Sequence, residues 1–392
     1  MFETGLEVFL KKDYKKYQKL RLAFLCNQAS VDSQLRHVSH LVTEKKYKLN
    51  VTCFLGPQHG IRGEKQDNMI ESEDFIDPTT QLPVISLYSK TREPSNEVMD
   101  RFDVLFVDLQ DIGTRIYTFM YTMANCMRAA KRTGKKVVVL DRPNPINGLD
   151  TEGHVLDTDF ISFVGQFPIC VRHGMTMGEL ACLFNETFGI RCDLEVIRMK
   201  GWKRAQYAED LKRIWIPPSP NIPTPQIALT FPGTVLFEGT NISEGRGTTT
   251  PLEWVGAPFI NPDHLADHMN KLKLKGVYFR PVYFQPTYQK GKDHVCGGVQ
   301  LHVLNRKVFK PYAAGVYLLA AIKQLYPEKF EWKKPPYEYE YDKMPIDLIA
   351  GTSRLREIID SGQSPKEFLK DGEKQCAQFK KVRAKHLLYK SR

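Results

Sequence analysis

Four short apolar runs mark the first part of the chain, from Leu22 to Cys26, Val51 to Leu55, Val104 to Val107 and Val137 to Leu140. The runs are continuous rather than alternating with polar residues, which indicates strands covered on both faces, as in a parallel sheet. Helical patterns separate them along the chain. We therefore expect an α/β fold whose first domain is a Rossmann-like, doubly wound parallel sheet.

The clearest helical pattern covers Ile116 to Thr133. Apolar and methionine side chains recur there at helical spacing, basic residues fill the last turns, and Gly134 supplies a stop. Further along, a proline-rich loop from Pro217 to Pro223 is rigid and extended. We expect it to lead into a strand at Ile227 to Phe231.

The pattern changes after about residue 256. Alternating apolar and aromatic positions predict strands from Val277 to Phe284 and from Val299 to Val303, and a helix is expected from Ala313 to Leu325. We therefore divide the chain into a Rossmann-like catalytic or sugar-binding domain, residues 1–255, and a second, smaller C-terminal α/β domain, residues 256–392, that completes a cleft.

Polar residues follow each of the four apolar runs. Ligands of doubly wound sheets bind at the carboxyl ends of the strands, so these positions are the first place to look for a site. A single Asp there is as often a helix cap or a turn former, but the agreement of four strand ends favours a binding site. The residues are Asn27 and Gln28, then Gln58, His59 and Arg62, then Asp108, Gln110, Asp111 and Arg115, and finally Asp141, Arg142 and Asn144.

One loop, from Phe237 to Pro251, is too rich in Gly, Thr, Asn and Ser for a helix or a core strand, yet it holds Glu238, Glu244 and Arg246. Hydroxyls, amides, carboxylates and a guanidinium, with glycines that let the backbone approach a ligand, suit a hydroxyl-rich molecule such as a sugar. A solvated surface loop is the plain alternative. Glu244 in particular would serve equally as a salt-bridged brace or as a catalyst.

Composition and motifs exclude several functions. The 392 residues carry a formal net charge of +11, but the lysines are scattered, and no zinc-finger, RNP-like or helix-turn-helix pattern supports nucleic-acid binding. No GxGxxG or P-loop pattern follows a strand, which argues against a nucleotide cofactor. Without a CxxC pair or another metal-ligand spacing, we expect no metal ion and no cofactor.

The eight cysteines fall mostly within apolar runs, where a thiol acts as a small hydrophobic group. The first residues lack the apolar core of a signal peptide, and no apolar run is long enough to span a bilayer. As given, the chain is expected to be cytoplasmic and reduced, with no membrane contact, unless a signal peptide has been removed. The oligomeric state is left open.

Seven strings occur in order: GPQHGIRG, VDLQDIGTRIYTF, LDRPNPING, RHGMTMGEL, PPSPNIPT, EGTNISEGRGTTTP and CGGVQLHV. Over nearly the whole chain they resemble a bacterial family, once known only as a domain of unknown function, now represented by exo-β-N-acetylmuramidases of the NamZ type. The resemblance implies two α/β domains with the site in the cleft between them. It also implies a glycoside hydrolase that removes N-acetylmuramic acid from the non-reducing end of peptidoglycan fragments, with a small glycan or muropeptide as its substrate.

Gln58 departs from that family pattern. Relatives with this activity typically carry Glu there, in a Gly-Pro-Glu-His-Gly motif, and that Glu is a leading candidate catalytic carboxylate. A glutamine cannot exchange a proton as a carboxyl group does, and most glycosidases need two carboxyl groups. Three outcomes are open: a neighbour such as Glu64 or Asp67 substitutes, the mechanism is altered, or the protein binds sugars without cleaving them.

The candidate catalytic residues are Gln58, Glu244, Glu238, Asp108 and Glu179, although Glu179 has the spacing of a capping box with Thr176. Candidate arginines suit the lactyl carboxylate of muramic acid, and Tyr117 suits a sugar face, with a core role as the plain alternative for this ring. The candidate binding residues are His59, Arg62, Gln110, Asp111, Arg115, Tyr117, Asp141, Arg142, Asn144, His173, Ser219, Asn221, Thr240, Asn241, Arg246 and Thr248.

Overall fold

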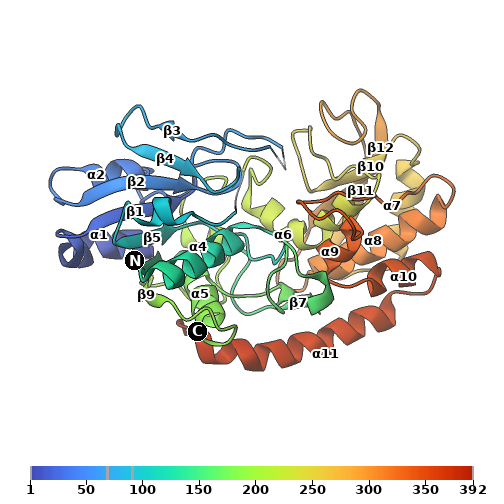
Figure 1. Cartoon of the computed structure of the whole chain (residues 1–392). Coiled ribbons are helices and arrows are strands. Elements are labelled where there is room, and N and C mark those ends of the chain that lie inside the picture. The colour runs from blue at the N-terminus through green and yellow to red at the C-terminus, as the bar shows by residue number, and fades with distance from the viewer. Residues whose placement is uncertain (1, 68–69, 90–91, 391–392) are drawn as a thin grey trace.

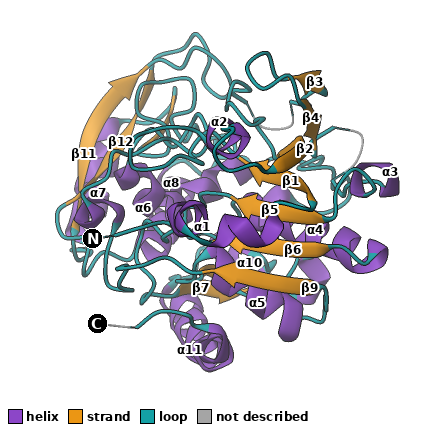
Figure 2. Cartoon of the chain, turned by 90° about the vertical axis from the view of Figure 1, so that its left-hand side faces the viewer, coloured by secondary structure: helices purple, strands orange, loops and turns teal. Residues whose placement is uncertain are grey.

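A seven-stranded sheet organises the first half of the chain in the computed structural model, which describes residues 2–67, 70–89 and 92–390 (Figure 1). Its order is β3-β4-β2-β1-β5-β6-β9, with β3 antiparallel to β4 and the other neighbours parallel (Figure 2). The Rossmann-like expectation is confirmed. The strands are β1 (Arg21–Cys26), β2 (Asn50–Gly56), β3 (Phe75–Ile76), β4 (Pro83–Ser86), β5 (Val104–Asp108), β6 (Lys136–Leu140) and β9 (Asp193–Ile197).

Helices cover both faces of this sheet because successive strand residues point to opposite sides. Phe24 of β1 packs in one core with α1 (Gly5–Lys11) and α2 (Val38–Thr43). Leu25 packs in the other core with α4 (Phe119–Thr133) and α5 (Met177–Glu186), which α3 (Asn96–Met99) also joins. Two buried faces explain why the apolar runs in the sequence are continuous rather than alternating.

The helix predicted from Ile116 begins three residues later, at Phe119. Residues 114–118 form a turn instead, in which the Tyr117 amide donates to the Thr114 carbonyl at 3.0 Å. The predicted C-terminal end of helix α4 is confirmed. Gly134 adopts a left-handed conformation with φ 65°, and its amide donates to the Ala130 carbonyl. Because α4 begins only at Phe119, the turn at residues 114–118 can contribute side chains to the candidate site.

The rest of the chain builds a smaller α/β unit around a three-stranded antiparallel sheet of order β10-β12-β11, as the sequence predicted. A two-stranded sheet of β7 and β8 is inserted in the chain between β6 and β9 of the large sheet. The elements are β7 (Glu152–Val155), β8 (Cys170–Arg172), α6 (Pro225–Thr234), β10 (Trp254–Ala257), α7 (Pro262–Lys271), β11 (Val277–Phe284), β12 (Cys296–Val303), α8 (Pro311–Leu325), α9 (Pro345–Ala350), α10 (Arg354–Asp360) and α11 (Lys366–Arg383).

The strand expected at Ile227 to Phe231 is wrong, because this segment belongs to helix α6. Thr224 caps the helix by accepting a hydrogen bond from the Ile227 amide, and Pro225 occupies the first turn, where a missing N–H costs nothing. Buried on every side, the helix is apolar all round. A short apolar run of this kind does not distinguish a buried helix from a buried strand.

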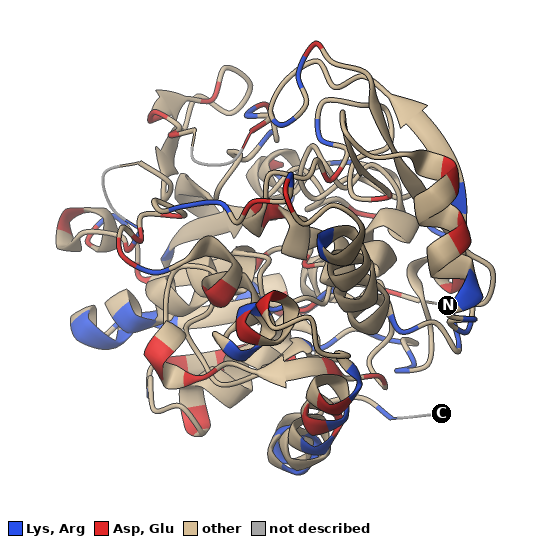
Figure 3. Cartoon of the chain, turned by 90° about the vertical axis from the view of Figure 1, so that its right-hand side faces the viewer, with Lys and Arg blue, Asp and Glu red and all other residues tan. Residues whose placement is uncertain are grey.

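Helix α11 leaves the smaller unit and runs back beneath the molecule to the N-terminal half, where the chain ends near the large sheet (Figure 1). Residues of both charge signs are interspersed along the elements shown in Figure 3. Among the described residues, no helix is both long and apolar enough to cross a membrane.

Helices α6 and α8 meet through two glycines. A Cβ added to Gly233 would lie 2.1 Å from the Pro311 carbonyl oxygen, and one added to Gly315 would lie 2.3 Å from the Gly233 carbonyl oxygen. Contacts this short force the backbones apart. The joint between the two helices therefore requires glycine on both sides.

We expect Gly315→Ala to destabilise the protein by about 1–3 kcal/mol, because overpacking at this joint exceeds the gain in helix propensity that alanine brings. Gln324→Ala, at an exposed position of the same helix, is the matched control and should change stability little. Denaturant unfolding of both variants measures the difference. A Gly315→Ala protein more stable than the parent would show that α6 and α8 do not pack as closely as described.

Candidate active site

A pocket opens between the large sheet and the smaller unit, and we call it the central pocket. Its walls come from the loop after β2, the turn before α4, the loop before α6, the 3₁₀ segment η4 (Val235–Gly239) and the tract before α9. Apolar side chains form part of the lining, including Ile116, Phe231 and Leu252. The polar lining residues are Gln58, His59, Tyr117, Thr118, Ser219, Asn221, Glu238, Arg246, Tyr337 and Glu338.

A hydrogen-bond network on one side of the pocket holds Gln58 and Glu338 together. The Thr118 hydroxyl donates to Oε1 of Gln58 at 2.7 Å, which fixes the amide so that its Nε2 faces Glu338. This Nε2 donates to Oε1 of Glu338 at 3.3 Å and to the Tyr88 hydroxyl at 3.1 Å. Tyr88 in turn donates to Oε2 of Glu338 at 2.8 Å. Both oxygens of the buried carboxyl group are therefore oriented.

The backbone around Glu338 is strained. Glu338 and Tyr339 have φ values of 45° and 68°, a left-handed region that residues with side chains seldom adopt. The turn is held by Arg92, whose guanidinium lies 4.1 Å from the ring centroid of Tyr88 and 3.9 Å from that of Tyr339. Strain of this kind persists where surrounding contacts impose it, and it concentrates at functional sites.

A second carboxyl group, that of Glu238, lines the same pocket. The Tyr337 hydroxyl donates to its Oε2 at 2.6 Å, and Arg246 forms an ion pair with its Oε1. Arg246 also lies 3.1 Å from a carboxylate oxygen of Glu244. One guanidinium therefore bridges two glutamates, and η4 brings Glu238 to the pocket wall.

The environment pushes the pKa values of the two carboxyl groups in opposite directions. Burial raises the pKa of Glu338, and the negative charge of Glu238 raises it further, against the hydrogen bonds from Tyr88 and Gln58. Burial also acts to raise the pKa of Glu238, but the charge of Arg246 and the Tyr337 hydroxyl outweigh it, so the net shift is downward. One pocket thus holds a carboxyl group with a raised pKa and another with a lowered pKa.

His59 lies beside them in a left-handed conformation with φ 72°. Its Nδ1 is 2.7 Å from the Lys65 carbonyl oxygen, an acceptor, which places the ring proton on Nδ1 and leaves Nε2 able to accept. Burial lowers the pKa of the imidazole to about 4. The ring is therefore neutral near pH 7.

A neighbouring pocket shares Glu238, Arg246 and Tyr337 with the central pocket and continues along the predicted sugar-binding loop. Its wall includes Glu244, which forms an ion pair with Lys290 at 2.6 Å. Thr240 and Asn241 line it as well. Thr248 lines neither of these pockets, and its hydroxyl donates to the Gly245 carbonyl within the loop.

Several candidates from the strand ends form contacts within the protein rather than lining the central pocket. Buried Asp108 pairs with Arg142, whose Nη2 lies 2.9 Å from the carboxylate. Other contacts join Arg62 to Asp77, His173 to Asp111 at 3.5 Å, Gln110 to the Pro143 carbonyl, Asn144 to the Met175 carbonyl, and Arg115 to the Ile349 carbonyl at 2.8 Å. Gln110 and Arg142 line a separate pocket.

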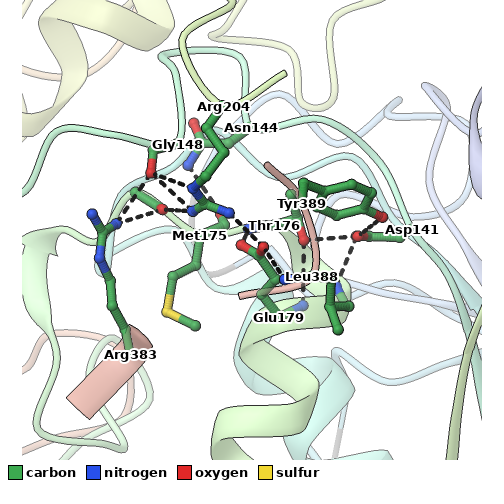
Figure 4. Close-up of polar contacts among 12 residues, drawn as sticks. Asp141, Asn144, Gly148, Met175, Thr176, Glu179, Arg204, Arg383, Leu388 and Tyr389 are labelled. Atoms are coloured by element: carbon green, nitrogen blue, oxygen red, sulfur yellow. Dashed lines mark hydrogen bonds and ion pairs between the residues drawn. The ribbon is translucent and has the colours of Figure 1, made fainter. Parts of the chain in front are cut away.

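Glu179 and Asp141 anchor the C-terminal segment of the chain (Figure 4). The capping box predicted for Thr176 and Glu179 is present, and the free oxygen of Glu179 pairs with Arg204 and accepts from the Leu388 amide at 2.8 Å. Asp141 accepts from Thr176, from the Gly178 amide and from Tyr389. Neither carboxylate lines the central pocket.

Glu338, Tyr337, Tyr88 and Thr118 were not among the residues predicted from sequence. The end of the tract from Phe330 to Tyr341 alternates tyrosines with glutamates, from Tyr337 to Tyr341, and this was the one local signal in the sequence. No spacing rule connects it to the loop after β2, since Gln58 and Glu338 are 280 positions apart. Among the described residues, no group of three or more His, Cys, Asp or Glu could hold a metal ion.

Comparison with known proteins agrees with this architecture. Profiles described as the N-terminal and C-terminal parts of exo-beta-N-acetylmuramidase NamZ match residues 22–226 and 229–389. Peptidoglycan beta-N-acetylmuramidase NamZ of Bacillus subtilis strain 168 is 43% identical over 388 residues, 99% of this chain and 91% of that protein. Crystal structures of two DUF1343 family proteins from Bacteroides fragilis are similar to this chain. The first has a TM-score of 0.89 and 34% sequence identity, with 99% of both chains covered. The second has a TM-score of 0.77 and 29% identity, with 100% of both chains covered. With matches over nearly its whole length, the chain belongs to the exo-beta-N-acetylmuramidase NamZ family.

Proposed function

We propose that this protein is an exo-β-N-acetylmuramidase that releases N-acetylmuramic acid from the non-reducing end of small peptidoglycan fragments. The observation that carries the proposal is the pair of carboxyl groups in the central pocket, Glu338 with a raised pKa and Glu238 with a lowered one. Glycoside hydrolysis needs such a pair, one group to protonate the leaving oxygen and one to act as a carboxylate. Membership of the NamZ family supports the choice of sugar.

In this proposal Glu338 is the proton donor. Its raised pKa favours the protonated carboxyl group, and Tyr88 and Gln58 orient its two oxygens. Gln58 then acts as a positioning residue rather than as the acid, since its amide holds the carboxyl group that does the chemistry. The carboxyl that the family motif places at position 58 is supplied here from the tract before α9.

Glu238 supplies the negative charge that faces the positive charge developing on the sugar ring in the transition state. Arg246 and Tyr337 hold it ionised. The neutral His59 offers Nε2 as an acceptor for a sugar hydroxyl. Further sugar contacts fall to the other polar lining residues of the central pocket, Tyr117, Ser219 and Asn221, and no cofactor is required.

The alternative function is that of a sugar-binding protein that has lost catalysis. The reason to consider it was that Gln58 replaces the expected glutamate. The family match does not favour it. The contact between Gln58 and Glu338 also removes its main argument, because a carboxyl group lies within hydrogen-bond distance of the position where one is missing. Neither Glu64 nor Asp67 lines the central pocket as Glu338 does.

Release of N-acetylmuramic acid from the disaccharide MurNAc-GlcNAc tests the function directly. We expect turnover by the parent protein and a fall of about 10²- to 10⁴-fold in kcat for Glu338→Gln, which removes the proton donor. Glu340→Gln, two residues along in the same tract, is the matched control and should keep parental activity. No turnover by the parent at high enzyme concentration would refute the function, whereas full activity of Glu338→Gln would refute only this assignment.

The pH dependence of kcat/KM follows from the opposite pKa shifts. The rate should fall as pH drops through the lowered pKa of Glu238, which must be ionised, and as pH rises through the raised pKa of Glu338, which must be protonated. The acidic limb of the profile should therefore lie below the ordinary pKa of a glutamate, and the alkaline limb above it. A narrow profile with both limbs near the usual range of Glu would contradict the assignment.

Gln58→Glu places a second carboxyl group in contact with Glu338. Two carboxyl groups in contact share a proton, because both cannot ionise easily, so the apparent pKa of the alkaline limb should rise. The measurement is the alkaline limb of the kcat/KM profile, with Gln58→Met as a variant that fills the same space without adding charge. An alkaline limb unchanged in Gln58→Glu would show that the two side chains do not meet in the active enzyme.

A further inference from the structure

Two cysteines that are far apart in the sequence lie in contact in the folded chain. Cys170 lies in β8 and Cys376 in α11, 206 positions apart, and their sulfur atoms are 3.0 Å from each other. This distance is shorter than van der Waals contact between two sulfur atoms. The Sγ of Cys376 also lies 3.0 Å from the Gly153 carbonyl oxygen of β7. Both side chains are buried in one core.

This pairing is specific among the eight cysteines. The others are Cys26, Cys53, Cys126, Cys182, Cys192 and Cys296, and no hydrogen bond joins two of these thiols in the part of the chain that the structure describes. Buried single thiols of that kind are inert small hydrophobes. Cys170 and Cys376 instead have the proximity that disulfide formation requires.

Solvent reaches only one member of the pair. Cys376 forms part of the wall of a cavity of about 340 Å³ that also includes Arg172, Lys275, Lys307 and Lys310. Cys170 does not line it and is fully buried. The wall also carries Asp150, Glu152 and Glu373, of which Asp150 pairs with Arg172 and Glu373 with Lys310. Lys275 and Lys307 add positive charge, which favours the approach of a small anionic oxidant.

The electrostatics of the pair favour the accessible thiol as the nucleophile. Contact with Cys170 lowers the pKa of the Cys376 thiol, and the charge of Lys380 adds to this effect. Burial raises the pKa of Cys170, so that thiol keeps its proton. Since the thiolate is the attacking species, Cys376 reacts first and Cys170 resolves.

We propose that Cys170 and Cys376 are a redox-active pair that forms an intramolecular disulfide, with a small anionic disulfide as the oxidant. The Cys376 thiol loses its proton, and its sulfur attacks the small disulfide and expels one thiol. The Cys170 thiol then loses its proton and attacks the Cys376 sulfur of the mixed disulfide, which expels the second thiol. In total, two protein thiols are oxidised to one disulfide and one small disulfide is reduced to two thiols.

The bond ties α11 covalently to β8. Arg383, near the end of α11, already donates to the carbonyl oxygens of His173 and Gly174, which follow β8 directly. The disulfide adds a covalent restraint to this contact and closes a long loop, which restricts the unfolded chain. The lining of the central pocket contains neither cysteine, so the bond stabilises the scaffold without changing the catalytic groups.

The test oxidises the full-length native protein with millimolar glutathione disulfide, alkylates the remaining thiols after denaturation, and maps the peptides by mass. We expect a loss of two hydrogen atoms per chain, a linked peptide pair containing Cys170 and Cys376, and a melting temperature raised by several degrees that dithiothreitol reverses. Muramidase activity should not change on oxidation. This separates the outcome from that of the proposed function.

Cys376→Ser and Cys170→Ser should both lose the melting-temperature shift, and Cys182→Ser, which alters a half-buried thiol on α5, should retain it. Peptide mapping on the parent protein decides the question even if a variant folds poorly. Eight alkylated cysteines after oxidation would overturn the proposal. So would a cross-link between other cysteines, or Cys376 left as a stable mixed disulfide with glutathione.

Discussion

The contact between Gln58 and Glu338 is the interaction on which the site depends, because it joins the carboxyl edge of the large sheet to the tract before α9. The contact exists only while the two halves of the chain are held in one arrangement. The hydrogen bond from Arg115 to the Ile349 carbonyl at the end of α9 joins the two halves, and the glycine joint fixes the packing of α6 on α8. A cation at the C-terminal end of a helix is favourable, so a buried arginine is tolerable there. The packing contacts that stabilise the scaffold therefore also form the site.

Electrostatics within the central pocket explains how two glutamates acquire different chemistry. Glu338 accepts hydrogen bonds from the neutral donors Tyr88 and Gln58, and burial outweighs them, so its pKa is raised. Glu238 is equally buried but lies against a guanidinium, so its charge is retained. The strained turn at Glu338 is held by the stack of Arg92 on Tyr339. Position in the fold, rather than residue type, gives the two glutamates opposite pKa shifts.

The remaining strand-end residues show what else a parallel sheet needs at its carboxyl edge. Asp108 ends strand β5 and Asp141 directly follows strand β6, both inside the protein, where an unpaired carboxylate would be costly. Arg142 compensates the first, while backbone and hydroxyl donors around α5 satisfy the second. Glu179 is satisfied by its capping role and by Arg204. These groups secure the loops and the C-terminal segment that surround the pocket, and the same residue types in the sequence are compatible with either use.

The sequence by itself determined the sheet, its two covered faces and the family, because continuous apolar runs and ordered motifs are local properties of the chain. It also identified one wall of the central pocket, in Gln58, His59, Glu238 and Arg246. It mistook α6 for a strand, since a short buried run has no periodicity that distinguishes the two. Only the tertiary structure decided that Glu338 is the carboxyl beside Gln58. Glu338 lies 280 positions from Gln58 in the sequence. The packing of α6 on α8, the stacking of Arg92 on Tyr88 and burial hold it there, and none of these contacts leaves a pattern along the chain.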